Sequence, residues 1–584
     1  MEYVLNLMTL IAVWVIAVQG YMLIKGLGGL LHLGHPVFYG LGAYTAAILS
    51  RRLLPPGTYP VDLLLSALVA VVGAFAIGWP ALRARGRYFM LVTFSVQLMF
   101  FTLVSNLHGL TGGPDGITRI PRFALGPWTI TTAAVTLLFV CGLAASSYVF
   151  CHFLIRSPYG RLVRAVRDDE IAVEAFGKDP LWAKLSIFAI GAGVTGAAGS
   201  VFAHYLRYVG PTQFGLDLVM LFLVMLVLGG QYSLAGVTVG AVVVGAMIEG
   251  LRFAPLPHEV SAYLHQVIFG ILLVAILFVR PDGLFPEQFA RYRRRGMSEN
   301  HPVMTKRWDL LPTARHEDGL RRSGDADAAI LEARGLVKHF GGVAAVDGCD
   351  LALAPGRITA VIGPNGAGKT TIFNLLTGFV PPDAGRVVFQ GREITGWTPP
   401  AIARVGLGRT FQDVRIWPRL TVIENVLVAM PAQLGERPLL VWPVIPAVSR
   451  QERDNLEAAW RLLERFGLEP KANESGSALS YAQQKMLSLA RLTALDASVM
   501  LLDEPTAGVD IRRLAVFLDH IRAFAVEQGR TVCLIEHNMD VVRELADWVL
   551  FMNEGRVVAS GSPQDVLGDR HLMSIYLGYS KVEP

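Results

Sequence analysis

Cysteine is scarce in this sequence. The 584 residues include only four cysteines, and no two of them form a Cys-x-x-Cys pair or lie within a cluster of metal-ligand residues. This argues against a disulfide framework and against a cysteine zinc site, so we interpret these residues as small apolar groups. They are Cys141, Cys151, Cys349 and Cys533.

A strong excess of one charge is also missing. The formal net charge is only +5, and much of it lies in short basic clusters beside apolar segments. We interpret those clusters as markers of membrane topology, and we expect no nucleic-acid partner.

Charged residues are rare up to about Phe285, where long apolar stretches follow one another. Crossing about 30 Å of hydrocarbon takes roughly 20 apolar helical residues, because lipid offers no partner to free backbone groups. The sequence therefore predicts an all-α polytopic membrane domain with about nine transmembrane helices. The candidate segments are 3–19, 27–50, 61–82, 88–107, 128–155, 181–205, 216–228, 234–250 and 262–279.

The first apolar segment resembles a signal peptide in length only. It has no basic region before it and no small-residue cleavage site after it, so we expect a retained membrane helix. The basic stretches 83–87, 156–167 and 291–295 are expected on the cytoplasmic side, which puts the N-terminus outside. Arg51 and Arg52 then fall on the unfavourable side, and a re-entrant segment near 26–34 would change the parity.

Two glycine-containing motifs interrupt the apolar segments. One is Leu33-Gly34-His35-Pro36, and the other is the Thr-Gly-Gly-Pro-Asp-Gly run at 111–116. Broken helices near the membrane midplane often mark substrate sites, but small residues serve equally well for close helix packing. The sequence leaves both interpretations open.

A charged stretch lies between two predicted spans. Residues 165–177 predict a short amphipathic helix that ends at Gly177. Such a helix suits docking into a cytoplasmic partner, although a solvated loop helix has the same pattern.

These motifs together resemble the membrane subunit of branched-chain (hydrophobic) amino-acid ABC importers. The resemblance covers about 21–285 and includes the Leu-Gly-His run at Leu33, the Arg-Gly-Arg-Tyr-Phe run at Arg85 and the Ser-Pro-Tyr-Gly-Arg loop at Ser157. It implies that loop 156–180 is the coupling helix that touches the ATPase. Leu30 and His32 depart from the family, in which a glutamine and a serine are usual.

A polar segment at 291–328 separates this half from a soluble α/β domain. We therefore predict three parts: a permease domain at 1–290, a linker at 291–328 and an ATP-binding domain at 329–584. A β-rich opening at 331–353 and a strand at 358–362 precede the sequence Gly-Pro-Asn-Gly-Ala-Gly-Lys-Thr-Thr.

This glycine-rich run is a P-loop in its required position between a strand and a helix. Its backbone N–H groups are suited to cradle the phosphates of ATP, Lys369 to reach the β- and γ-phosphates, and Thr370 to ligate Mg²⁺. The predicted ATP contacts in the loop are Gly363, Asn365, Gly366, Gly368, Lys369, Thr370 and Thr371.

About 130 residues later, an apolar strand at 499–502 ends in Asp503 and Glu504. Hydrolysis requires one carboxylate for Mg²⁺ and another that orients or deprotonates water. We assign the first role to Asp503 and the second to Glu504. A strand that ends in acidic surface residues is the alternative, and the P-loop argues against it.

The remaining motifs resemble the ABC class of ATPases. Gln412 fits the Q-loop position, where it also contacts the metal, and His537 fits the switch histidine that senses the γ-phosphate. Phe340 falls where an aromatic ring stacks on adenine. The signature-like run Leu-Ser-Tyr-Ala-Gln contributes Ser480, Ala482 and Gln483, and the D-loop contributes Asp510.

The resemblance implies that the signature of one ATPase domain caps the nucleotide of another, so the chain must pair. Ala482 replaces a glycine of the usual signature, and its methyl group is expected to weaken the site that it caps. The Arg-Thr-Phe-Gln run at Arg409, the proline-rich stretch 430–446 and the tail from Gly561 also resemble the ATPases of branched-chain amino-acid importers.

The sequence therefore predicts ATP-driven import of branched-chain or related small amino acids by a fused half-transporter in the inner membrane, with the ATPase domain cytoplasmic. The expected partners are a second permease/ATPase pair (a homologous chain or a second copy), an external substrate-binding protein, the small-molecule substrate and membrane lipid. Alternatives are an importer of urea or short amides, an ABC exporter and a membrane protein that binds nucleotide without transport.

Overall fold

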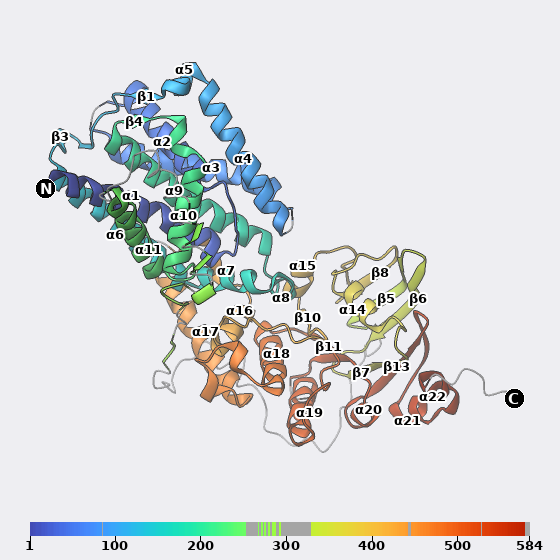
Figure 1. Cartoon of the computed structure of the whole chain (residues 1–584). Coiled ribbons are helices and arrows are strands. Elements are labelled where there is room, and N and C mark those ends of the chain that lie inside the picture. The colour runs from blue at the N-terminus through green and yellow to red at the C-terminus, as the bar shows by residue number, and fades with distance from the viewer. Residues whose placement is uncertain are drawn as a thin grey trace. The chain divides into compact units, whose positions relative to one another are not determined.

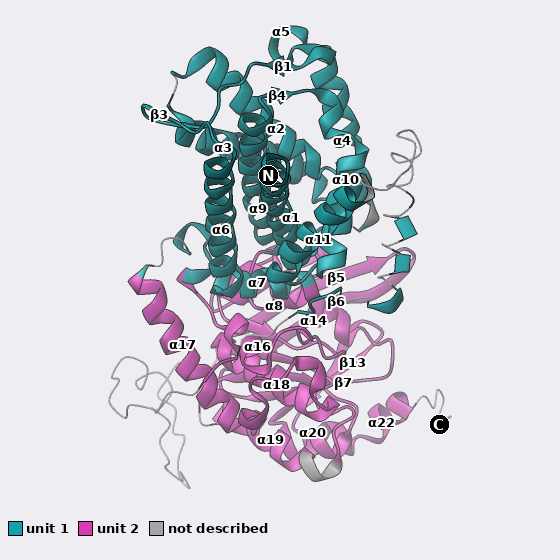
Figure 2. Cartoon of the chain, turned by 60° about the vertical axis from the view of Figure 1, so that its left-hand side comes forward, with its two compact units in different colours: residues 1–167, 180–289, 435–445 teal, residues 168–179, 290–434, 446–584 magenta. Residues whose placement is uncertain are grey.

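The computed structural model describes residues 1–252 apart from 56 and 85, scattered positions between 267 and 293, and 329–577 apart from 442–444 and 527. The described chain forms two compact units (Figure 2). Unit 1 comprises Met1–Arg167, Pro180–Phe289 and Gly435–Ile445; unit 2 comprises Asp168–Asp179, Ala290–Leu434 and Pro446–Pro584. The predicted linker lies almost wholly outside the described residues.

Unit 1 is a helical bundle (Figure 1). Its main helices are α1 (Glu2–Tyr21), α2 (His35–Ile48), α3 (Tyr59–Ala81), α4 (Arg87–Asn106), α6 (Ala133–Arg156), α7 (Pro158–Asp168), α9 (Pro180–Leu206), α10 (Leu216–Gly229) and α11 (Leu234–Arg252). Helix α9 is buried along most of its length and packs against α1, α2 and α3.

Six helices of the described chain are long and apolar enough to cross a membrane. They are Glu2–Leu27, Tyr59–Ala81, Tyr88–Asn106, Ala133–Arg156, Pro180–Leu206 and Pro211–Gly229. Two further apolar helices, α2 and α11, also correspond to predicted spans, and most of the predicted span 262–279 lies outside the described residues. The count of nine therefore stays a prediction.

Two predicted span boundaries were wrong. The segment predicted at 27–50 becomes helical only at His35, because a π-helical turn (Met22–Leu27) extends α1 and the stretch up to Gly34 follows as a break. The span predicted from residue 128 begins at Ala133, because Trp128–Thr129 forms strand β3, which pairs with β2 (Ala124–Leu125).

Close contact at glycines holds the centre of unit 1 together. A Cβ atom added to Gly42 of α2 would lie 2.0 Å from the Gly196 carbonyl oxygen of α9, and one added to Gly199 would lie 2.0 Å from that of Tyr39. The backbones of α2 and α9 thus approach closely at glycines, as is common between membrane helices.

Unit 2 contains two sheets, in which the outer strands include β8 (Ala384–Phe389), β9 (Arg392–Glu393), β13 (Trp548–Asn553) and β14 (Arg556–Gly561). One is a mostly parallel six-stranded sheet in the order β10-β11-β12-β7-β13-β14, and the other is a four-stranded antiparallel sheet in the order β6-β5-β8-β9. The strands that matter here are β5 (Leu331–Phe340), β6 (Val343–Leu353), β7 (Ile358–Ile362), β10 (Leu407–Arg409), β11 (Val499–Asp503) and β12 (Thr531–Ile535). Strands β7, β11 and β12 are buried at every position, which is typical of central parallel strands. The predicted opening strands and the strand before the P-loop are confirmed.

The charged stretch predicted as one helix at 165–177 forms two. Helix α7 ends at Asp168 and α8 (Glu170–Ala175) begins beyond Asp169, which adopts an extended backbone and accepts a hydrogen bond from the Ala172 N–H. An aspartate that caps a new helix must leave helical geometry, so the cap breaks the predicted helix. Gly177, which follows α8, has a φ of 76°, as its predicted terminating role requires.

Candidate active site

The P-loop lies between β7 and α14 (Lys369–Leu376). Gly368 immediately precedes α14 with a φ of 93°, and a Cβ atom there would lie 2.3 Å from the Ala345 carbonyl oxygen, so only glycine fits. The Lys369 ammonium group donates to the carbonyl oxygens of Gly363 and Pro364, each at 2.8 Å. Asn365, Gly366 and Thr370 are exposed, and Thr371 is partly exposed.

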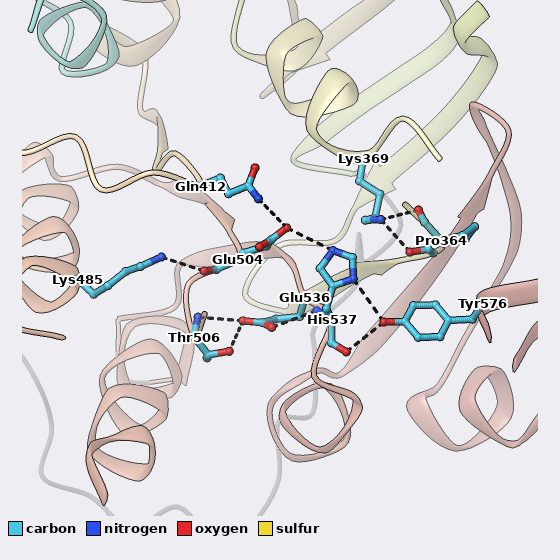
Figure 3. Close-up of polar contacts among 10 residues, drawn as sticks. Pro364, Lys369, Gln412, Lys485, Glu504, Thr506, Glu536, His537 and Tyr576 are labelled. Carbon is cyan, nitrogen blue, oxygen red and sulfur yellow. Dashed lines mark hydrogen bonds and ion pairs between the residues drawn. The ribbon is translucent and has the colours of Figure 1, made fainter. Parts of the chain in front are cut away.

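Glu504 lies directly after β11 and is the meeting point of two other predicted site residues (Figure 3). Gln412 Nε2 donates to Glu504 Oε1 at 3.3 Å, and His537 Nε2 lies 3.3 Å from the same oxygen. The backbone of Glu504 has a φ of 46°, which is unusual for a residue with a side chain and is typical of functional positions. The structure thus brings together three residues that are 92 and 33 positions apart in sequence.

Residues that the sequence analysis missed hold these groups in place. Lys485 Nζ donates to the backbone carbonyl of Glu504 at 3.0 Å. The Tyr576 hydroxyl donates to the His537 carbonyl oxygen at 3.1 Å and lies 3.4 Å from His537 Nδ1. Lys485 lies in no recognisable motif, and Tyr576 lies in the tail from Gly561, whose resemblance to related ATPases gives this tyrosine no role.

Asp503, the last residue of β11, is 1% exposed, and neither of its carboxylate oxygens has a hydrogen-bond partner in the described chain. Burial raises the pKa of Asp503 to about 6, although Arg409, whose Nη2 lies 3.8 Å from Oδ2, acts in the opposite direction. Buried carboxylate oxygens without donors suit a hard cation, so the site fits Mg²⁺.

The other predicted nucleotide contacts lie apart from this group. Ser480 caps α18 (Tyr481–Leu495), where its side chain and that of Gln483 form a capping box, and Ala482 lies in the first turn. Phe340, at the end of β5, is 52% exposed. Among the described contacts, none joins Ser480 or Phe340 to Glu504.

Residues 168–179, which we call the docking segment, belong to unit 2. The Asp169 carboxylate forms an ion pair with Arg415 at 3.0 Å, and Arg404 Nε donates to the Gly177 carbonyl oxygen at 2.8 Å. At the far end, Lys178 Nζ donates to the Met430 carbonyl oxygen at 2.8 Å. The segment therefore contacts the ATPase at both ends, through charge and through backbone carbonyls.

Comparison with known proteins supports both halves. The family described as the permease component of branched-chain amino acid transport systems matches residues 3–277, and the ABC transporter family matches residues 346–507. The match to the permease family and the apolar helices indicate a membrane protein, and the ABC match indicates a cytoplasmic ATPase.

Relatives of the ATPase half cover 43% of the chain. The chain is 39% identical over 249 residues to the high-affinity branched-chain amino acid transport ATP-binding protein BraF of Pseudomonas aeruginosa, of which it covers 98%. It is 37% identical over 249 residues to LivG of Escherichia coli K12, which has the same description and the same coverage. A solved nucleotide-free ATP-binding cassette of an ABC transporter is 31% identical, with a TM-score of 0.37, over 43% of this chain and 99% of that one.

The buried strands, the P-loop and the carboxylates of Asp503 and Glu504 are those of an ATP-hydrolysing cassette. Taken with the permease match, they show that this chain belongs to the branched-chain amino-acid ABC transporter family and carries both a permease domain and an ATPase domain.

Proposed function

We propose that the chain is a fused half-transporter that uses ATP to import branched-chain or related small amino acids across the inner membrane. The observation that carries the proposal is the convergence of Gln412 and His537 on Glu504, on a chain that also matches the permease family. The function named for the relatives, branched-chain amino acid transport, supplies the substrate class.

In this proposal Glu504 orients or deprotonates the attacking water. Gln412 and His537, which both contact its carboxylate, hold it in position and sense the γ-phosphate. Lys369 leaves its two loop carbonyls for the phosphates, which are a stronger, charged acceptor. Asp503, Thr370 and Gln412 would hold Mg²⁺, which would supply positive charge to neutralise the phosphates.

The remaining ATP contacts come from the P-loop and from a second cassette. Gly363, Asn365, Gly366, Gly368 and Thr371 surround the phosphates, and Phe340 stacks on adenine. The first turn of α18 and the D-loop cap the nucleotide of the partner cassette through Ser480, Ala482, Gln483 and Asp510. The methyl group of Ala482 weakens the site that it caps.

A second permease/ATPase pair and an external binding protein complete the transporter in this proposal. In this proposal the permease domain spans 1–290 and the ATPase domain spans 329–584. Native mass measurement of the purified complex separates a homodimer from a heteromeric assembly.

Reconstituted vesicles test the function directly. With the binding protein on one side and ATP on the other, we expect leucine to accumulate on the ATP side, and we expect no accumulation with the Glu504→Gln variant. Movement of leucine away from the ATP side would indicate an exporter. ATP-driven uptake of urea or a short amide in place of leucine would reassign the substrate.

A further inference from the structure

A pocket lies within unit 2, between the docking segment, α18 and the residues that follow β10. The pocket is partly open to solvent. The lining residues in the described chain are Ala172, Phe176, Arg409, Thr410, Phe411, Val414, Arg415, Lys485, Ser488, Leu489, Arg491, Pro505 and Phe517. The pocket therefore borders both the docking segment and the residue after Glu504.

All the charged side chains that line this pocket are basic. The lining includes four basic side chains and no acidic one. Three of the four already have partners elsewhere: Arg409 lies beside Asp503, Arg415 beside Asp169, and Lys485 donates to the Glu504 carbonyl. These contacts hold the positive groups around the pocket, and the Asp169 carboxylate that pairs with Arg415 also acts electrostatically on Arg491 from outside the lining.

Arg491, on α18, differs from the other three. It is 1% exposed, and its guanidinium carbon lies 3.8 Å from the ring centre of Trp417 and 4.5 Å from that of Phe176 in the docking segment. Nη1 donates to the Arg415 carbonyl oxygen at 2.6 Å, but Nε and Nη2 have no hydrogen-bond partner. Burial lowers the pKa of Arg491 to about 9, which shows how little solvation the charge retains.

The two nitrogens without partners define the kind of ligand that Arg491 can bind. Nε and Nη2 lie on the same edge of a guanidinium group, and this edge donates two parallel hydrogen bonds to the oxygens of a carboxylate or phosphate. The third nitrogen and the two ring contacts fix the plane of the group, so the free edge is already oriented. Buried donors of this kind are rarely left without a partner in folded proteins.

We propose that this pocket binds a small oxyanion, a phosphate or a carboxylate, on the Nε–Nη2 edge of Arg491, with Arg415 and Lys485 supplying further positive charge. Two sources fit this chemistry: the phosphate released by ATP hydrolysis and the carboxylate of a transported amino acid. The choice of sources rests on the proposed function, whereas the site itself does not.

The position of the pocket gives such an anion a regulatory role. The pocket touches Arg415, which holds Asp169 of the docking segment, and Lys485, which holds Glu504. An oxyanion here joins these cations by charge and stabilises the docked arrangement. Hydrolysis and docking then respond to the concentration of the anion in the cytoplasm.

Binding to the full-length protein in detergent tests the site. Because phosphate also binds the P-loop, the measurement uses the Glu504→Gln variant with Mg²⁺ and excess ATP, which occupies that loop. Potassium phosphate, acetate and leucine are titrated separately at constant ionic strength, with chloride as the reference, by calorimetry and by thermal unfolding. We expect saturable binding of phosphate or acetate and a higher unfolding midpoint. Phosphate alone points to the hydrolysis product, and binding of acetate and leucine points to the carboxylate.

Three variants of this protein make the test specific. Arg491→Met is expected to weaken anion binding at least tenfold, whereas Arg522→Met, on the exposed surface of α19 (Ile511–Val526), leaves it unchanged. If Arg491→Met fails to fold, Ser488→Asp places a carboxylate at the pocket wall and is expected to abolish binding with Arg491 intact. Anion affinity equal to the parent's in both Arg491→Met and Ser488→Asp, or no saturable binding of any anion, overturns the proposal.

The measurements distinguish failure of the anion site from failure of the proposed function. If Glu504→Gln fails to retain ATP, the role of Glu504 is wrong, and the titrations are repeated in Lys369→Ala. Anion binding that depends on Arg491 in that background still supports the pocket.

Discussion

The two units use buried polar groups in different ways. In unit 2 the polar side chains around Glu504 contact one another, and Thr506 donates to Glu536, which in turn accepts from the backbone N–H of His537. In unit 1, buried groups such as the Tyr39 hydroxyl and the Ser66 hydroxyl have no hydrogen-bond partner in the described chain, while glycines bring α2 and α9 into contact. The group around Glu504 thus depends on charge and hydrogen bonds, whereas the contact between α2 and α9 depends on shape.

The largest effect that this comparison predicts is on hydrolysis. Glu504→Gln removes the carboxylate on which Gln412 and His537 converge, so we expect ATP turnover to fall at least about 100-fold while ATP stays bound. Release of phosphate and retention of labelled ATP are the measurements. Glu544→Gln, on the surface of the same unit, serves as the control, and wild-type turnover by Glu504→Gln would remove the assigned role.

In unit 1 we expect a single added methyl group to lower the stability of the fold substantially. Gly42→Ala places a carbon 2.0 Å from the Gly196 carbonyl oxygen, which backbone movement must relieve at a cost of about 2–3 kcal/mol. A lower unfolding temperature in detergent measures this cost.

Gly142→Ala is the matched control for this change. No atom lies within 4 Å of the added carbon, and alanine favours the helix by up to about 1 kcal/mol. Equal effects of the two changes would mean that shape does not hold unit 1 together.

The pH dependence of hydrolysis tests the electrostatic side of the comparison. Only the ionised form of Asp503 holds Mg²⁺, and with its pKa raised to about 6 the protonated form dominates below that pH. We therefore expect the Mg²⁺ concentration needed for half-maximal hydrolysis to rise about tenfold per pH unit below pH 6 and to stay constant above about pH 7. A constant Mg²⁺ requirement from pH 5 to 7 would contradict the role of Asp503.

The smallest effect is expected at the docking segment. Asp169→Asn keeps a good helix cap for α8 but removes the charge beside Arg415, a partly exposed pair. We expect transport per ATP to fall about two- to fivefold, since such pairs contribute up to about 1 kcal/mol, with hydrolysis little changed. Asp540→Asn, 91% exposed at its side chain, is the control.

Local patterns in the sequence predicted much of unit 2. A buried strand, a glycine turn and a helix follow one another within 19 residues around Lys369, so the P-loop is readable without the fold. Helices α3, α4 and α9 were predictable for the same reason, because long apolar runs need no distant partner to be recognised.

The rest depends on contacts between distant residues. Lys485 reaches the Glu504 carbonyl across 19 residues, and Tyr576 reaches His537 across 39, and neither contact leaves a pattern along the chain. The break between α7 and α8 was missed because a capping aspartate and a solvent-facing aspartate have the same sequence signal. Val441, in the proline-rich stretch, packs in the apolar core of unit 1, and no local pattern in the sequence indicates this contact.

The assignment of the docking segment to unit 2 has a practical consequence for dividing this protein into fragments. A fragment that starts at residue 329 keeps the P-loop and both carboxylates but loses Phe176, one of the two rings that enclose the Arg491 guanidinium. Such a fragment exposes a buried cation and part of an apolar wall to water, so we expect it to be less soluble than its composition suggests. We therefore expect a soluble ATPase fragment to need two pieces of chain: the part from residue 329 onward and a peptide that spans 165–180.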